Sequence, residues 1–204
     1  MIRVLLKGGL GNQMFQYALG KTLALENGTS VVLDTSFIEN RLPVKGFTYR
    51  NYELDFFQIE NPIDKFSNIE LIDKYISYPI FVLKNRILKN PSYVLEGNNP
   101  YEYNPAVFER GSNIILEGYW NNPKYFLKRE NEIKKIFDLD KFYDKKFREI
   151  EDKINSFQSV SVNIRRGDYI NNKHANVFNF LDEDYYHKAI NIIRKEVKNP
   201  HFFI

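Results

Sequence analysis

The sequence predicts an α/β fold with a parallel sheet, because two stretches of the chain each read as strand, helix and strand. The first stretch covers residues 2–34 and the second covers residues 159–204, with a further apolar strand expected at residues 114–117. One crossover cannot bury both faces of a parallel sheet. We therefore expect a first domain at residues 1–156 and the beginning of a second, truncated domain at residues 157–204.

The composition is that of an ordinary globular protein. The 204 residues are 43% hydrophobic and 27% charged, and the net charge is +3, with basic residues spread among acidic ones. A nucleic-acid partner is not expected, because it would need a basic face or stripe. The chain has no cysteine, which excludes disulfides and thiolate metal sites. No apolar run suits a signal peptide or an integral membrane segment, so we expect a cytoplasmic protein and leave peripheral attachment to the inner membrane open.

The first βαβ unit contains a glycine-rich loop, Lys7-Gly8-Gly9-Leu10-Gly11-Asn12-Gln13, directly after the apolar strand at residues 2–6. The loop is expected to open a helix from Asn12 to Asn27, with Asn12 as its N-cap and Gly28 as its stop. The spacing predicts an apolar helix face made of Phe15, Ala18, Leu19 and Leu23.

The same loop partly matches a dinucleotide-binding pattern, with Gly9, Gly11 and the later acidic residue Asp34. The third small residue of that pattern is missing, because Met14 stands where glycine or alanine would allow close helix–sheet packing. The loop is not a P-loop, since no Lys-Ser or Lys-Thr follows the glycines. A dinucleotide oxidoreductase is therefore the weaker interpretation, and a tight turn into the helix also accounts for the loop.

The second βαβ unit begins at residues 159–164, where valine and isoleucine alternate with small or polar residues as in a half-buried strand. The strand runs into Arg165-Arg166-Gly167-Asp168-Tyr169. Ligands of open α/β sheets bind at the carboxyl ends of strands, and the planar guanidinium fits phosphate oxygens in pairs. Two interpretations stay open: an anion clamp for a nucleotide diphosphate, and a surface turn with an internal Arg–Asp pair.

The acidic residues 182–184 are expected to cap the next helix, whose apolar face is predicted to carry Tyr186, Ala189, Ile190, Ile193 and Val197. Residues 201–204 then begin another strand. Asp138-Leu139-Asp140 matches an Asp-x-Asp metal signature, but it lies between two expected helices. Capping of the polar helix at residues 141–155, the expected interdomain linker, is therefore the preferred interpretation, and no metal site is assigned.

Four segments, taken in order along the chain, resemble one family. Lys7 to Ala18 is similar to the amino-terminal signature of bacterial α-1,2-fucosyltransferases, glycosyltransferase family 11. Leu116 to Phe126 resembles the family's middle segment, and Val160 to Tyr169 resembles its His-x-Arg-Arg-Gly-Asp-Tyr motif. Asp184 to Phe203 looks like the helix and strand that follow that motif.

The resemblance implies a GT-B-like enzyme, with an amino-terminal Rossmann-like domain on the acceptor side and the start of a Rossmann-like donor-binding domain. It implies inverting transfer of L-fucose from GDP-β-L-fucose to the 2-hydroxyl of a galactose-terminated glycan, with no metal or other cofactor. Arg166, with Arg165 beside it, would stabilise the negative charge on the β-phosphate, and Asp168 would orient the guanidiniums. The base would be a carboxylate that the sequence does not identify.

The resemblance also implies further donor- and acceptor-binding residues: Gly9, Gly11, Asn12, Gln13, Asn163, Gly167 and Tyr169. The chain departs from the family pattern at Asn163, which stands at the motif's histidine position. The family's Ser-Asp-Asp region would begin just beyond Ile204, so we expect a fragment. The alternative function is that of a non-catalytic nucleotide-sugar or glycan-binding remnant.

Overall fold

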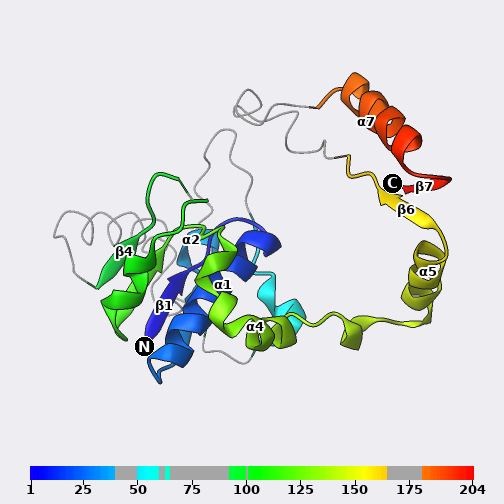
Figure 1. The fold of residues 1–204 in the computed structure, drawn as a ribbon. Helices are drawn as coiled ribbons and strands as arrows, with labels where there is room; N and C mark the ends of the chain where they lie inside the picture. Colours follow the sequence, from blue (N-terminus) through cyan, green and yellow to red (C-terminus); the bar gives the residue numbers. More distant parts are fainter. Residues whose placement is uncertain (40–49, 60–62, 65–91, 100, 165–180) are drawn as a thin grey trace. The chain divides into compact units, whose positions relative to one another are not determined.

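The computed structural model describes residues 1–39, 50–59, 63–64, 92–99, 101–164 and 181–204 (Figure 1). Among these residues, those up to Asp138 form one compact unit and those from Leu139 onward form a second one. The expected division into domains at residue 156 stays a prediction. No helix in the described part of the chain is long and apolar enough to cross a membrane.

A five-stranded parallel sheet, in the order β3-β2-β1-β5-β4, forms the centre of the first unit. Its bounds are β1 (Ile2–Leu5), β2 (Val31–Asp34), β3 (Ile63–Asp64), β4 (Tyr93–Leu95) and β5 (Ile114–Glu117). Leu5 lies opposite Asp34 on one side and Glu117 on the other, so the central strands end in one row. The sheet confirms the predicted α/β class, because three consecutive strands of apolar residues are buried side by side.

Helix α1 (Leu10–Glu26) begins two residues before the expected start at Asn12. Its N-cap is Gly9, with extended backbone (φ −83°, ψ −175°), so the expectation that Asn12 caps the helix is wrong. The chain already turns at Gly8, whose φ is +73°, and this turn lets the helix begin at Leu10. At the other end, Gly28 has φ +59° and follows the C-cap, which confirms it as the helix stop.

The face of α1 toward the sheet confirms the expected apolar stripe at its buried residues Ala18, Leu19 and Leu23. Gly20 lies on the same side, and a Cβ atom there would come within 2.5 Å of Val4 Cγ2 on β1. The close helix–sheet contact that Met14 cannot provide is therefore made later in the helix, by Gly20.

The segment after β5 consists of three short helical pieces. Asn122 caps the first of them by accepting a hydrogen bond from the Lys124 amide at 3.0 Å, directly before Pro123. The pieces are η3 (Pro123–Tyr125), η4 (Leu127–Arg129) and α4 (Glu130–Ile136), and the breaks between them fall at Phe126 (φ −130°, ψ 10°) and Arg129 (φ −125°, ψ 28°), whose backbone is not helical. Further short elements in the described part of this unit are α2 (Ser36–Glu39), η1 (Leu54–Phe57) and η2 (Pro105–Arg110).

The second unit contains the second predicted βαβ element. Strands β6 (Gln158–Ser161) and β7 (Pro200–Phe203) pair in parallel, with α7 (Glu183–Glu196) between them in sequence. The α7 residues Tyr186, Ala189, Ile190 and Ile193 are half-buried while the others are exposed, which confirms the predicted face. Asp182 caps α7 by accepting a hydrogen bond from the Tyr185 amide at 2.9 Å.

Strand β6 is shorter than the expected strand at residues 159–164. Its last ladder bond joins the Val162 amide to the Phe203 carbonyl at 2.8 Å, one residue beyond the end of the strand. Three residues, Val162 to Ile164, therefore separate the strand from Arg165, and Ile164 is exposed.

The segment before β6 corrects the expectation for Asp138-Leu139-Asp140. Asp144 caps helix α5 (Lys145–Asn155) by accepting from the Phe147 amide at 2.9 Å, so neither Asp138 nor Asp140 is the cap. A 3-10 turn, η5 (Asp140–Phe142), comes first and delays the helix.

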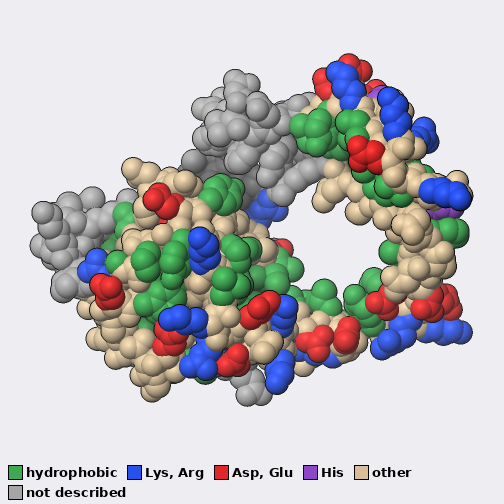
Figure 2. Space-filling view, in the orientation of Figure 1, with side chains coloured by type: hydrophobic (Ala, Val, Ile, Leu, Met, Phe, Trp, Pro, Cys, Tyr) green, Lys and Arg blue, Asp and Glu red, His purple; other side chains and the backbone are tan. Residues whose placement is uncertain are grey.

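Basic and acidic side chains lie interspersed over α5 and α7 on the face drawn in Figure 2. Among the described residues, no group of three or more His, Asp or Glu side chains is arranged to hold a metal ion.

Candidate functional site

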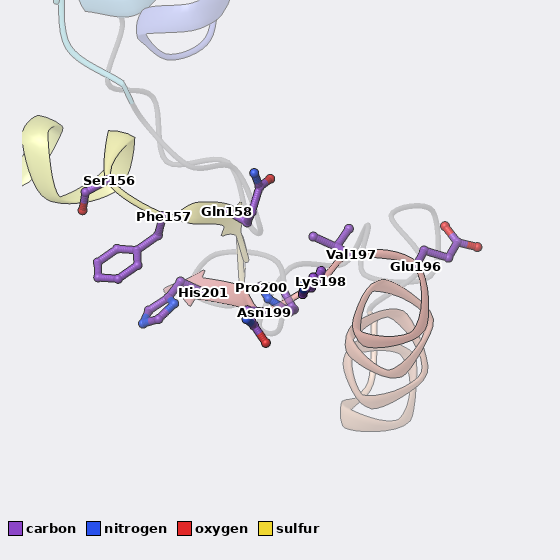
Figure 3. Close-up of a pocket in the computed structure, with 9 residues that line it drawn as sticks. All are labelled: Ser156, Phe157, Gln158, Glu196, Val197, Lys198, Asn199, Pro200 and His201. Atoms are coloured by element: carbon purple, nitrogen blue, oxygen red, sulfur yellow. The ribbon is translucent and has the colours of Figure 1, made fainter.

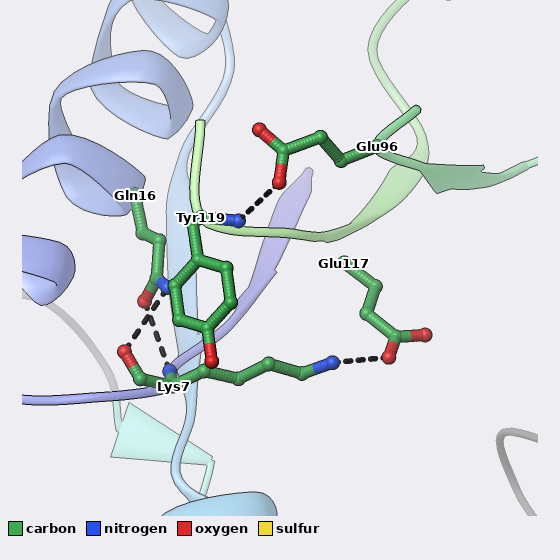
Figure 4. Close-up of polar contacts among 5 residues, drawn as sticks. All are labelled: Lys7, Gln16, Glu96, Glu117 and Tyr119. Atoms are coloured by element: carbon green, nitrogen blue, oxygen red, sulfur yellow. Dashed lines mark hydrogen bonds and ion pairs between the residues drawn. The ribbon is translucent and has the colours of Figure 1, made fainter. Parts of the chain in front are cut away.

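The candidate site lies at the carboxyl edge of the five-stranded sheet (Figure 4). In open parallel sheets, ligands bind outside the carboxyl ends of the strands, where the strand order changes direction. The order changes at β1, because the chain places β2 and β3 on one side of it and β4 and β5 on the other. The segments that leave β1, β5 and β4 here begin at Leu6, Gly118 and Glu96.

Gln13 holds the glycine-rich loop from inside the protein. Its side chain is completely buried, and Nε2 donates to the carbonyls of Gly8 (2.9 Å) and Asn51 (2.8 Å). Its Oε1 accepts from the Glu53 amide at 3.0 Å. The amide group therefore fixes the loop against residues 51–53, and a hydroxyl of a ligand could reach it only in exchange for one of these bonds.

Gln16 fixes the first residue of the loop in a similar way. Its Oε1 accepts from the Lys7 amide at 3.0 Å, and its Nε2 donates to the Lys7 carbonyl at 3.1 Å (Figure 4). The side chain is completely buried. Sequence reasoning missed Gln16, although a glutamine among the apolar residues of a buried helix face is a signal for such a role, because a buried amide needs partners.

The glycines of the loop differ in whether a Cβ atom would fit at their positions. A Cβ atom on Gly8 would lie 2.3 Å from Asn12 Nδ2, and the positive φ there adds strain. A Cβ on Gly9 would meet ordinary contacts, at 3.7 Å from Glu53 Oε2, and one on Gly11 would meet nothing within 4 Å. The steric need for glycine therefore lies at Gly8, which the sequence motif did not single out, while Gly9 and Gly11 leave open backbone at this edge.

An ion pair between Lys7 Nζ and Glu117 Oε1 connects the segment after β1 with the last residue of β5. The Lys7 and Glu117 side chains are 13% and 2% exposed. The Lys7 ammonium also lies 5.1 Å from the centre of the Phe37 ring. Separating these charges would leave a buried ion without its partner, so the pair keeps the two segments in register.

The Glu96 side chain holds the turn after β5 in place by binding backbone amides of that turn. Its two carboxylate oxygens accept from the amides of Tyr119 and Trp120, both at 2.6 Å. Gly118 makes room for this contact, because a Cβ there would lie 2.3 Å from Glu96 Cβ. Burial raises the pKa of Glu96 above its ordinary value, against the lowering by these two amides and by Lys7. Burial, and then the charge of Glu96, raise the pKa of Tyr119.

Trp120 has an unusual backbone for a large residue, with φ +57°. It is buried, and its ring meets Tyr125 edge-on at 5.6 Å between centroids. Tyr125 is anchored in turn, since its hydroxyl accepts from the Asn104 amide at 2.9 Å and donates to the Glu102 carbonyl at 3.2 Å. The Trp120 indole N–H is buried and has no hydrogen-bond partner among the residues that the structure describes.

Most of the residues predicted to bind the diphosphate lie outside the described residues: Arg165, Arg166, Gly167, Asp168 and Tyr169. The anion clamp therefore stays a prediction. Asn163 is described and exposed, and its carbonyl accepts from the Tyr186 hydroxyl at 3.4 Å. Asn12, half-buried in the first turn of α1, and the exposed Gly11 lie at the carboxyl edge of the first sheet.

A hollow of about 1000 Å³ in the second unit is lined by residues 156–158 and 196–201 (Figure 3). The rings of Phe157 and His201 stack within it, 3.9 Å apart. These residues precede or begin β6 and β7, so the hollow lies at the amino ends of the two strands. Ligand sites of parallel sheets lie at the opposite ends, and we assign no function to this hollow.

Asp34 argues against the dinucleotide interpretation of the loop. It is completely buried, Oδ2 lies 3.3 Å from Arg3 Nη1, and Oδ1 accepts from the Ser36 amide at 3.0 Å. The carboxylate is bound to protein groups at the end of β2, whereas in a dinucleotide site it would be available to the ribose hydroxyls.

The described architecture is that of an α/β protein with a Rossmann-like parallel sheet and a glycine-rich loop at its carboxyl edge. The chain belongs to glycosyl transferase family 11, whose model matches residues 104–204. It is 30% identical over 203 residues to an alpha-1,2-colitosyltransferase of Escherichia coli, covering 98% of this chain and 66% of that protein. It is also 29% identical over 208 residues to the O-antigen biosynthesis glycosyltransferase WbnK of Escherichia coli, covering 92% of this chain and 66% of that protein.

These comparisons confirm the family resemblance found in the sequence motifs. The chain spans 66% of the length of both curated relatives, just under two thirds. No solved structure matches the chain.

Proposed function

We propose that this chain belongs to an inverting glycosyltransferase that moves L-fucose from GDP-β-L-fucose to the 2-hydroxyl of a galactose-terminated glycan. The observation that carries the proposal is the 30% identity, across 98% of the chain, to a protein named alpha-1,2-colitosyltransferase. That name favours a second candidate donor, GDP-colitose, because colitose is L-fucose without its 3-hydroxyl.

In the proposed chemistry, two arginines stabilise the negative charge that develops on the diphosphate. As the bond between the anomeric carbon and the β-phosphate oxygen breaks, negative charge grows on that phosphate and must be neutralised. Arg166 is the leading residue for this role, with Arg165 beside it and Asp168 orienting the guanidiniums. A guanidinium binds two phosphate oxygens at once and stays charged at any physiological pH, so no metal or other cofactor is expected.

Further residues are proposed to bind the donor or the acceptor. Gly9, Gly11 and Asn12 leave backbone and an amide side chain at the carboxyl edge of the first sheet, where a sugar could approach. Gln13 would act by holding this loop in place, given its three bonds to backbone groups. Asn163, Gly167 and Tyr169 are proposed to bind on the arginine side.

A non-catalytic nucleotide-sugar or glycan-binding protein is the alternative, and one residue favours it. Asn163 stands where the motif of the family has histidine, and an amide cannot take up or release a proton as an imidazole can. This alternative predicts binding of the donor without transfer of the sugar.

Titration calorimetry of the whole chain with GDP, GDP-fucose and GDP-colitose tests the proposal. We expect GDP to bind and Arg166→Ala to weaken it at least about tenfold, since a charged hydrogen-bonded pair contributes about 1.5–3 kcal/mol. Arg148→Ala is the matched control, because Arg148 is an exposed arginine on α5. Equal affinity of the Arg166→Ala chain and the unmodified chain for GDP would remove the assigned role. Incubation with a galactoside then separates transfer from binding alone.

A further inference from the structure

We propose that the turn after β5, residues 118–120, forms one wall of a binding site for a neutral sugar ring. Tyr119 is the residue that contacts the sugar, and Glu96 is a positioning residue that acts through the backbone of the turn. The inference rests on the proposed function, because both substrates proposed there carry a sugar ring. It assigns roles to two residues that the proposed function leaves without one.

The turn exposes one side chain and buries its neighbours. Glu117 and Trp120 are 1% and 2% exposed, whereas Tyr119 between them is 38% exposed. Figure 4 shows the Tyr119 amide facing the Glu96 carboxylate, while the Tyr119 ring extends away from that carboxylate. The turn therefore presents a single aromatic ring at the edge of the sheet where ligands bind.

The conformation of the turn is held from several sides. The two Glu96 oxygens bind the Tyr119 and Trp120 amides at 2.6 Å each, and only a glycine at residue 118 leaves space for that contact. Trp120 keeps its positive φ of +57° although it is not glycine. Backbone conformations of this kind persist only where the surroundings impose them, and they gather at ligand sites.

The charges around Tyr119 select the chemistry of the ligand. Among the described residues, Lys7 is paired with Glu117, and Glu96, whose pKa Lys7 lowers, adds a second carboxylate beside the turn. A phosphate would be repelled here, whereas the hydroxyls of a neutral sugar can donate to a carboxylate. The raised pKa of Tyr119 keeps its phenol protonated at neutral pH, so it can both donate to and accept from a sugar hydroxyl. An exposed ring with a few polar groups is a common lining of small-molecule sites.

Saturation-transfer NMR on the whole chain tests the site with two probes, methyl β-D-galactopyranoside and methyl α-L-fucopyranoside. We expect at least one of them to bind and Tyr119→Ala to weaken it about fivefold to tenfold, which is about 1–1.4 kcal/mol, because the variant loses the ring that contacts the sugar. Tyr119→Phe keeps the ring and should weaken binding less than Tyr119→Ala does. The affected probe assigns the wall to the acceptor side if it is the galactoside, and to the donor sugar if it is the fucoside.

Glu96→Gln separates a positioning role from a general loss of structure. The amide keeps one oxygen to accept from the turn and loses the other, so sugar affinity should fall to a value between those of the unmodified chain and Glu96→Ala. Leu25→Ala and Glu26→Gln are matched controls, because both residues are exposed at the far end of α1 and Leu25 is exposed as much as Tyr119, 39% against 38%. Fluorescence of Trp120, the one tryptophan of the chain, shows whether each variant is folded.

Three results would overturn the inference: neither sugar binds the unmodified chain, folded Tyr119→Ala and Tyr119→Phe bind the sugar as the unmodified chain does, or Leu25→Ala weakens binding equally. The GDP titration described above distinguishes this failure from failure of the proposed function. If the chain binds sugar through Tyr119 but never binds GDP or a GDP-sugar, the wall stands and the transferase proposal falls. If GDP binds through Arg166 while replacing Tyr119 has no effect on sugar binding, the transferase proposal stands and the proposed sugar-binding wall falls.

Discussion

The side-chain amide of Gln16 binds both backbone groups of Lys7, accepting from its N–H at 3.0 Å and donating to its C=O at 3.1 Å. A helix side chain here takes the place that a neighbouring strand would have beyond the end of β1. The glycine-rich loop therefore begins from a fixed point, and the Lys7 ammonium is directed toward Glu117.

Replacing Gln16 by leucine should destabilise the first unit. The change leaves the two backbone groups of Lys7, which are partly buried, without these partners, and we expect the free energy of unfolding to fall by at least about 2 kcal/mol. Urea unfolding followed by Trp120 fluorescence measures this unit specifically, because Trp120 is buried in it and the chain has no other tryptophan. Lys21→Gln, on a half-exposed position of the same helix, is the control. An unchanged midpoint in Gln16→Leu would contradict the role.

The glycines of the loop should respond differently to alanine. Gly8→Ala forces a Cβ against Asn12 at a positive φ, so we expect a loss of about 1–3 kcal/mol. Gly11→Ala places its Cβ in open space within α1 and should change stability little or raise it by up to about 1 kcal/mol. Chemical unfolding of the two variants side by side measures the contrast, and equal effects would refute it.

Gly20 and Val4 should be energetically coupled. A Cβ on Gly20 would lie 2.5 Å from Val4 Cγ2, so Gly20→Ala alone should destabilise the first unit by about 1–3 kcal/mol through overpacking. Val4→Ala alone should destabilise it by leaving a cavity, whereas the double variant should recover part of the loss because the added methyl group enters that space. A double-mutant cycle on unfolding free energies measures the coupling, and simple additivity of the two losses would contradict the packing.

The stability of the first unit should depend on pH through Glu96. Its pKa is raised in the folded protein above the ordinary value of 4.5, chiefly by burial, so the folded state binds the proton more tightly than the unfolded state. The contribution is therefore fully present below pH 4.5 and is lost as the pH rises through the folded pKa. Subtracting the unfolding free energies of Glu96→Gln from those of the unmodified chain, from about pH 4 to pH 7, should give a difference that falls with pH.

Glu132 serves as a control, because its pKa is shifted in the direction opposite to that of Glu96. Hydrogen bonds from its own backbone amide and from Arg129 lower its pKa below 4.5, so any stability that it adds is present above that pH and is lost as the pH falls through the folded pKa. The matching difference for Glu132→Gln should therefore not fall as the pH rises. A difference for Glu96→Gln that rises with pH would mean that burial does not dominate the environment of Glu96.

The regular elements could be predicted from the sequence where a local pattern is enough to specify them. The α7 face at Tyr186, Ala189, Ile190 and Ile193 follows the helical period, and the stop at Gly28 follows from its freedom to adopt a positive φ. The start of α1 at Leu10 could not be predicted in this way, because it depends on the turn at Gly8 and not on the capping preference of Asn12.

Sequence motifs also directed attention to one edge of the sheet without identifying the residues that shape it. Gly9 and Gly11 belong to the recognisable pattern, but the structure requires glycine at Gly8 and Gly118. Glu96 could not be found from sequence, since it acts on amides of Tyr119 and Trp120 that only the β4–β5 pairing brings near.

The sequence by itself determined the α/β class, the two βαβ elements and the family, because strand and helix periods and short motifs are local properties of the chain. The tertiary structure alone decided that Lys7 pairs with Glu117, that Gln13 and Gln16 serve the backbone of the loop, and that Glu96 holds the turn at Tyr119. The physical reason is burial: a polar group removed from water must find its partners among whichever segments the fold brings to it, however far apart they lie in the sequence.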